Sequence, residues 1–248
     1  MSNRVWIVAI DEPVYYGRLY AQLIQEYPGR IGGVIVMPGV PITVAELGYR
    51  LRLWGVRGCA YLFSRHVAAW WRRSGDLETA ARNAKVPVAK ATRLEEAVTW
   101  IHAQPGGTEA ALVLATVTRV VPAAVFESSG ARWSNVHCGP LPRYAGVDAP
   151  FWCLFNGEPL ATVTIHYMAE AVDAGPIMFQ ESVPAASRSY FQILDALFAL
   201  ALQGYRQILD SSDWPVPSRP QDLTQRTVVR KPAARLGREF RKRGLRIV

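Results

Sequence analysis

Apolar runs alternate with segments of helical periodicity along the first half of the chain. Residues 5–10 form a continuous apolar run that ends at Asp11, which is the pattern of a strand buried on both faces. Residues 15–27 place apolar side chains at helical intervals as far as Pro28, which predicts a helix. The same criteria predict strands at 33–36, 86–89 and 110–115 and helices at 43–54 and 93–103. This order predicts an α/β fold, a Rossmann-like, mostly parallel twisted sheet with helices on both faces.

The second half of the chain continues with strands and a long helix. We expect a short helix at 150–156, strands at 160–168 and 177–183, and a closing helix at 189–209 with one apolar face. Trp70 and Trp71 fall in a further predicted helix, where we interpret them as packing residues. No Gly-x-Gly-x-x-Gly follows the first strand and no Gly-Lys-Ser/Thr loop is present, so neither a dinucleotide nor a nucleotide triphosphate site is supported.

An amide, an imidazole and a carboxylate stand out in a stretch that is otherwise apolar or turn-forming. Asn135 and His137 are two positions apart in an extended segment, so their side chains point the same way. Asp173 opens the turn Asp-Ala-Gly-Pro, and Leu141-Pro142 marks another turn. We therefore expect these groups on loops at strand ends, where open α/β sheets bind their ligands.

In its order and spacing this set resembles the formyltransferases that use 10-formyltetrahydrofolate, a group that includes glycinamide ribonucleotide transformylase, methionyl-tRNA formyltransferase and the sugar N-formyltransferases. Their pattern is Asn-x-His, then Leu-Pro and aromatic-x-Gly, then a Val-Thr-Ile-His strand, then Leu-Asp-x-Gly. The resemblance covers about residues 100–210. It is carried here by Asn135, His137, Leu141, Pro142, Tyr144, Gly146, Val163, Thr164, His166, Asp173 and Gly175.

The resemblance implies transfer of a formyl group from 10-formyltetrahydrofolate, with no metal, to an amine that attacks directly. Such a site must stabilise the oxyanion and manage protons. Asn135 and a protonated His137 would donate to the oxyanion. Asp173 would raise the pKa of His137, keep it cationic and take the proton of the amine.

The resemblance also assigns supporting residues. The folate co-substrate is expected to contact Leu114, Leu141, Pro142, Val172 and Gly175. Contacts to the acceptor, or support of the catalytic groups, are expected from Arg143, Tyr144, Thr164 and His166. The chain departs from the family at Gly139-Pro140, where Ser-Leu is usual, and at Ala145, where a basic residue is usual, which changes the shape of this loop and the contacts to an anionic substrate.

Each of these residues also has a purely structural interpretation. A histidine is often a hydrogen-bonded structural residue, and His166 in its alternating strand stays open between that role and support of the site. Asp173 alone could be a turn former or a helix cap. Cys138 adjoins His137, but neighbours on a strand point to opposite faces, so we do not expect a nucleophilic thiol.

Composition and charge indicate the class of protein and its expected cellular location. The chain has 248 residues, half of them apolar, and three cysteines without paired or metal-ligand spacing. The N-terminus lacks a signal peptide or membrane-span pattern, so we expect a cytoplasmic protein without membrane contact. From Arg226 onward nine basic residues face one acid, Glu239, which leaves the preceding body neutral.

These features divide the chain into a formyltransferase catalytic domain at 1–210 and a Pro-containing linker with a basic C-terminal tail at 211–248, where 232–242 favours a short helix. The tail lacks interleaved aromatic residues, so we favour a solvated surface segment over RNA binding. The methionyl-tRNA enzymes add a C-terminal β-barrel for which this tail is too short. We therefore expect a small-molecule amine, such as an amino sugar or another biosynthetic intermediate.

Other functions and assemblies stay open at this point. One alternative is a formyltetrahydrofolate hydrolase, in which water replaces the amine. Others are a methionyl-tRNA formyltransferase, and an inactive formyltransferase-like protein that binds RNA through its basic tail. The sequence does not decide between a monomer and a homodimer.

Overall fold

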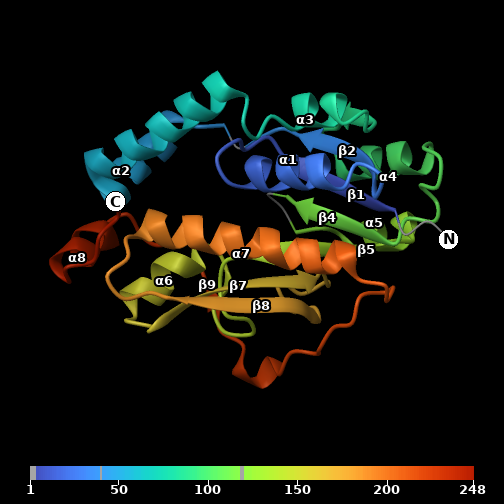
Figure 1. Cartoon of the computed structure of the whole chain (residues 1–248). Helices are drawn as coiled ribbons and strands as arrows, with labels where there is room; N and C mark the ends of the chain where they lie inside the picture. Colours follow the sequence, from blue (N-terminus) through green and yellow to red (C-terminus); the bar gives the residue numbers. More distant parts are fainter. Residues whose placement is uncertain (1–3, 40, 118–119) are drawn as a thin grey trace.

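A seven-stranded sheet flanked by helices forms the body of the protein in the computed structural model, which describes residues 4–39, 41–117 and 120–248 (Figure 1). The strand order is β3-β2-β1-β4-β5-β7-β8. The first five strands run parallel: β1 (Val5–Ile10), β2 (Ile31–Met37), β3 (Val88–Lys90), β4 (Leu112–Thr116) and β5 (Arg132–His137). The predicted mostly parallel α/β sheet is confirmed.

Two antiparallel strands extend the sheet beyond β5. β7 (Leu160–Tyr167) pairs with β5, and β8 (Ile177–Pro184) pairs with β7. The register places Asn135 opposite His166 and His137 opposite Thr164. The antiparallel pairing therefore brings the Asn-x-His and Val-Thr-Ile-His segments side by side.

Helices cover both faces of the sheet because its strands are apolar on both sides. Val5 and Ile7 of β1 belong to a core shared with α1 (Tyr16–Glu26), α3 (Leu77–Asn83) and α7 (Tyr190–Asp210). Trp6 and Val8 belong to a second core, on the opposite face, shared with α4 (Leu94–His102) and α5 (Ala123–Ser129). The short α6 (Ala149–Phe155) joins the first core through Phe151 and Leu154.

The α2 helix (Val44–Arg72) is much longer than the helix predicted at 43–54. It bends at Gly55, whose φ of 73° is non-helical. Few of its residues are buried, and Trp70 and Trp71 are 75% and 80% exposed. The interpretation of both tryptophans as packing residues is therefore wrong, because this half of α2 lies at the periphery of the molecule (Figure 1).

The C-terminal residues 211–248 pack against the body at three places. Arg219 forms an antiparallel bridge with Ile177, and β9 (Val228–Val229) pairs with β6 (Ala145–Gly146) in a second, two-stranded sheet. Between them lies a short 3-10 turn at Leu223–Gln225. Farther on, α8 (Leu236–Lys242) lies against α2, where the guanidinium of Arg241 donates to the carbonyl oxygen of Leu53 (Figure 1). The charged side chains of this segment are mostly exposed, whereas its apolar Phe240 and Ile247 are buried.

Among the described residues, no helix combines the length and the apolar character that a bilayer crossing requires.

A pair of helical glycines tests the packing of α1 against the segment that precedes α3. A Cβ at Gly17 would lie 2.3 Å from the backbone oxygen of Gly75, whereas a Cβ at Gly48 would meet nothing within 4 Å. We expect Gly17→Ala to lower the free energy of unfolding by about 1–3 kcal/mol, since backbone must shift. Gly48→Ala is expected to raise it by up to about 1 kcal/mol, because alanine favours helix. Urea unfolding of both variants measures the difference, and equal stabilities would contradict this packing.

Candidate active site

The predicted catalytic residues meet where β5 ends between β4 and β7. Asn135 lies beside Ala115 of β4 on one side and His166 of β7 on the other. His137 is the last residue of β5 and is 6% exposed. Asp173 reaches the same place from the turn between β7 and β8. The structure therefore brings Asn135, His137, His166 and Asp173 together at one edge of the sheet.

The carboxylate of Asp173 lies between two imidazoles. Its Oδ2 is 3.4 Å from Nδ1 of His137, and its Oδ1 is 3.4 Å from Nε2 of His166. The backbone N–H of Gly146 donates to Oδ2 at 2.7 Å. Burial alone would raise the pKa of Asp173, but His166, His137 and the Gly146 N–H together lower it to about 2. Asp173 is therefore an anion at neutral pH.

The imidazole of His137 is held inside the protein. Its Nε2 is 2.8 Å from the carbonyl oxygen of Tyr144, which makes this nitrogen the donor, while Nδ1 faces Asp173. Burial lowers the pKa of His137 below its ordinary value of 6.5 and outweighs the attraction of Asp173. Asp173 does raise this pKa, as expected, but the expectation that it keeps His137 cationic is wrong, because burial has the larger effect.

This arrangement changes what each group can do. Both ring nitrogens of His137 face protein groups, so the imidazole does not present a free N–H for a substrate oxygen. The side-chain amide of Asn135 has no hydrogen bond to another of the described residues, and the residue is partly exposed. Asn135 is thus the better placed donor, and the pair of His137 and Asp173 is better suited to accepting a proton and passing it on.

The departure from the family at Gly139 explains part of this geometry. A Cβ at this position would lie 2.6 Å from Nε2 of His137 and 2.7 Å from the Cβ of Ala149. The serine that is usual in the family would therefore collide with the imidazole as it lies here. The second departure, Ala145, is fully buried in a small cluster with Leu141 and Ile177, where a charged side chain would lose its hydration.

Hydrogen bonds from β7 and β8 fix the loop that follows His137. The hydroxyl of Thr164 donates to the carbonyl oxygen of Gly139 at 2.7 Å. The amide of Gln180 donates to the carbonyl oxygen of Leu141 at 3.0 Å and to the Thr164 hydroxyl at 2.9 Å. Thr164 is fully buried, so it supports the loop and is not accessible to a substrate amine.

The C-terminal segment contributes residues that the sequence analysis missed. The amide of Gln221 donates to the carbonyl oxygens of Asp173 and Gly175 at 2.9 and 2.6 Å. The hydroxyl oxygen of Thr227 accepts from the Tyr144 N–H at 3.0 Å. Gln221 is 48 positions from Asp173, and no local pattern marks it. For Thr227, the one local signal in the sequence is the apolar pair Val228-Val229 that follows it, which is compatible with a short strand.

The residues assigned to the folate contact lie at different depths. Leu114 and Leu141 are 0% and 4% exposed. Val172 is 40% exposed and Pro142 is partly exposed. Gly175 is buried, and a Cβ there would lie 1.9 Å from the carbonyl oxygen of Tyr167. Accessible apolar surface is thus available at Pro142 and Val172, whereas Leu114, Leu141 and Gly175 are buried.

The two residues that follow Pro142 turn away from the imidazole. The hydroxyl of Tyr144 donates to Glu158 at 2.8 Å, and the guanidinium of Arg143 is 3.4 Å from the same carboxylate. Tyr144 contributes to the site through its backbone carbonyl, not its ring.

A nucleophilic thiol and a metal site are two further possibilities that the residue types near His137 raise. Burial raises the pKa of Cys138 to about 12, so its thiol stays protonated at neutral pH and is a poor nucleophile. Within the described parts of the chain, no group of three His, Cys, Asp or Glu side chains could hold a metal ion.

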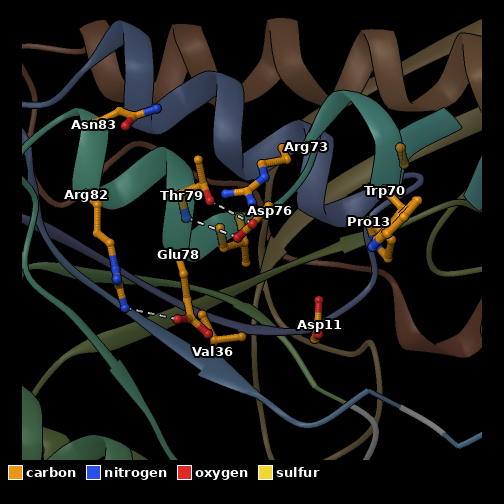
Figure 2. A pocket seen from close by; sticks show the side chains of 12 residues that line it. Asp11, Pro13, Val36, Trp70, Arg73, Asp76, Glu78, Thr79, Arg82 and Asn83 are labelled. Atoms are coloured by element: carbon orange, nitrogen blue, oxygen red, sulfur yellow. Dashed lines mark hydrogen bonds and ion pairs between the residues drawn. The ribbon is translucent and has the colours of Figure 1, made fainter. Parts of the chain in front are cut away.

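A cavity of about 680 Å³ lies on the same edge of the sheet, at the ends of β1 and β2 (Figure 2). Trp70 and Arg73 of the α2 end face it from one side, and Asp76 and Glu78 from the α3 side. Asn135, His137 and Asp173 do not line it.

Comparison with known proteins gives matches over part of the chain. Residues 88–196 match the family model described as Formyl transferase. A methionyl-tRNA formyltransferase of Syntrophus aciditrophicus is 37% identical over 83 residues, which are 34% of this chain and 27% of that protein. A phosphoribosylglycinamide formyltransferase of Bacillus subtilis is 31% identical over 72 residues, 29% of this chain and 37% of that protein. The chain spans less than half the length of these curated relatives.

Solved structures match over most of the chain. The phosphoribosylglycinamide formyltransferase of Anaplasma phagocytophilum has a TM-score of 0.58 at 18% identity and covers 84% of this chain and 87% of its own. WlaRD, a sugar 3N-formyl transferase, has a TM-score of 0.57 at 14% identity and covers 100% of this chain and 83% of its own. The resemblance to the formyltransferases is confirmed. The body of this protein has their fold, and residues 88–196 carry their sequence signature.

The contact at Gly139 gives a first test of the geometry of the candidate site. Gly139→Ala places a methyl group 2.6 Å from Nε2 of His137, so we expect the imidazole to move and its bond to Tyr144 to weaken. Nitrogen NMR of the histidine rings measures this through a changed Nε2 signal. Gly29→Ala, whose Cβ would meet nothing within 4 Å, is the matched control. An unchanged His137 signal in Gly139→Ala would contradict the geometry described.

The lowered pKa of Asp173 gives a second test. Its folded pKa of about 2 lies below the ordinary value of 3.8, so the ionised carboxylate stabilises the folded state above about pH 4. This contribution, roughly 2 kcal/mol, is lost as the pH falls from about 4 to about 2. Urea unfolding across this range should show that step in the wild type and not in Asp173→Asn. The exposed Asp213→Asn serves as the control and should retain the step.

Proposed function

We propose that this protein transfers a formyl group from 10-formyltetrahydrofolate to a primary amine of a small-molecule acceptor. The observation that carries the proposal is the Asp173 carboxylate between His137 and His166, beside the free amide of Asn135. Both strands and the connecting turn lie in the segment that matches the formyl transferase model. The site needs no nucleophile of its own, since the acceptor amine attacks.

Asn135 acts on the developing charge. When bound, 10-formyltetrahydrofolate supplies the formyl carbon that the amine attacks. The amide of Asn135 donates to the formyl oxygen as this oxygen becomes negative. A fixed donor in a partly buried site stabilises such charge strongly, because it needs no reorganisation.

Asp173 and His137 act on the proton of the amine. Asp173 is ionised at neutral pH, since its pKa is about 2, and a group this acidic holds a proton only briefly. Nδ1 of the neutral His137, 3.4 Å from the carboxylate, offers the lone pair that receives the proton next. The bond between the formyl carbon and the folate nitrogen then breaks, and this nitrogen takes up the proton as tetrahydrofolate leaves. His166 on the other side of Asp173 keeps the carboxylate oriented.

The chemistry of the surrounding residues fits a folate ring. Pro142 and Val172 provide partly exposed apolar surface on either side of the catalytic groups, and an aromatic ring system packs well on such surface. An amine acceptor would approach from the open side of Asn135. An amino sugar is our preferred acceptor because WlaRD, described as a sugar 3N-formyl transferase, matches this chain over its whole length.

Formyl transfer can be tested directly with the purified protein. It is incubated with 10-formyltetrahydrofolate and a panel of nucleotide-linked amino sugars, free amino sugars and other primary amines. Mass spectrometry should detect a gain of one formyl group in one class of acceptor. Sustained release of formate without any amine would instead show a hydrolase, and neither product would refute the proposal.

The role of Asn135 predicts a specific loss of rate. We expect Asn135→Ala to lower kcat by about a hundredfold or more, because one oxyanion donor is removed. Its unfolding free energy should stay close to that of the wild type, since the amide bonds to no other described residue. Gln207→Ala, which removes an exposed amide from α7, is the control and should keep full activity. A wild-type kcat in Asn135→Ala would exclude Asn135 as the donor.

A further inference from the structure

The second half of α2 presents a continuous apolar face to solvent. Val56, Phe63, Val67 and Trp71 are 75%, 70%, 45% and 80% exposed. Together with the exposed Ala60 and Trp70, they recur at intervals of three and four residues, so they lie on one side of the helix. The buried Gly58 and Ala69 lie on the opposite side. A monomeric protein seldom leaves such a row uncovered unless it binds something there.

The charge of α2 is entirely basic around this face. Between Glu46 and Asp76 the chain has six arginines and no acidic residue. Arg50 and Arg65 form ion pairs with Glu46 and Asp195. Arg52, Arg57 and Arg72 are exposed beside the apolar row, and their charges flank it.

The basic C-terminal segment adds to the same end of the molecule. The α8 helix lies against the first half of α2 (Figure 1), where a Cβ at Gly237 would lie 2.2 Å from the backbone oxygen of Leu53. Its Arg238, Arg241 and Lys242 are exposed. Two basic segments that are far apart in the sequence therefore lie next to each other at one end of the molecule. We refer to residues 44–73 and 236–246 together as the α2–α8 surface.

We propose that the α2–α8 surface binds peripherally to the surface of an anionic phospholipid membrane. Aromatic and aliphatic side chains on one side of a helix enter the boundary between headgroups and acyl chains. Tryptophan favours this boundary in particular. The arginines and lysines around the row attract the anionic headgroups. The earlier expectation of no membrane contact rested on the lack of a spanning segment, which this mode of binding does not need.

Two other occupants fit the surface less well. A second copy paired through α2 would place arginines against arginines with no acidic partner between Glu46 and Asp76, which is repulsive. A nucleic-acid platform relies on aromatic stacking, whereas the exposed apolar residues of α2 are mostly aliphatic. They comprise Val44, Leu47, Leu51, Val56 and Val67 against Phe63, Trp70 and Trp71. In the row itself, Val56, Ala60 and Val67 accompany Phe63, Trp70 and Trp71. A row of mixed aliphatic and aromatic side chains with positive charge nearby matches acyl chains below anionic headgroups.

Vesicle cosedimentation of the full chain tests this inference independently of the formyl transfer proposed above. Vesicles of phosphatidylcholine mixed with phosphatidylglycerol should bind the protein, and vesicles of phosphatidylcholine alone should bind it much more weakly. Binding should weaken as salt is added, because the charges are exposed.

Two double variants separate the apolar from the charged contribution. Phe63→Ala with Trp71→Ala should weaken partitioning by about tenfold or more, since both rings leave the boundary. Arg57→Gln with Arg72→Gln should weaken it by about tenfold or more at low salt, since each charge contributes about fivefold. Leu160→Ala, at an exposed site on β7, and the pair Arg93→Gln with Arg132→Gln, both exposed away from this surface, are the matched controls. Circular dichroism and urea unfolding show that each variant folds.

Several outcomes would overturn the proposal. One is the absence of binding to anionic vesicles, and another is undiminished binding of the Phe63 and Trp71 variant. Self-association in sedimentation velocity that this variant abolishes, without vesicle binding, would assign the surface to a second copy of the chain. Salt-sensitive binding of RNA without vesicle binding would assign it to nucleic acid.

Discussion

The contact between the Asp173 carboxylate and two buried imidazoles is the constraint on which the site depends. An anion at this depth is stable only if donors surround it. The Gly146 N–H donates to one carboxylate oxygen, and the imidazoles of His137 and His166 lie 3.4 Å from the two oxygens. Residues of β5, β6 and β7 therefore surround this buried anion together.

The antiparallel strands make that contact possible. A purely parallel sheet would end at β5 and leave Asn135 and His137 at an edge. Because β7 pairs antiparallel to β5, His166 lies opposite Asn135, and the turn that follows β7 carries Asp173 back over the end of β5. The C-terminal segment then holds this turn through Gln221. The geometry of the candidate site is thus set by backbone pairing on one side and by the C-terminal segment on the other.

Burial also decides the protonation of the site. Proximity to Asp173 favours a charged His137, but removal of the ring from water disfavours it more, and its pKa falls. Desolvation likewise disfavours the charged form of Cys138, but for a thiol this raises the pKa. The outer α2–α8 surface shows the opposite balance, since its arginines stay hydrated beside apolar side chains that are not covered. The site around Asp173 holds few charged groups, each buried and fixed by its neighbours. The α2–α8 surface carries many charged groups that are exposed to water.

The sequence by itself determined the α/β class, most of the strands and helices, and the choice of Asn135, His137 and Asp173 as candidate site residues. The first strand, for example, is apolar on both faces, and Asn135 and His137 share a face because strand side chains alternate. The tertiary structure alone decided the pKa direction of His137, because depth of burial does not follow from residue order. It alone revealed the contact of Gln221 with Asp173, 48 positions away, since no local periodicity records such a pairing. It alone exposed Trp70 and Trp71, because helical spacing shows that residues share a face but not whether anything packs against that face.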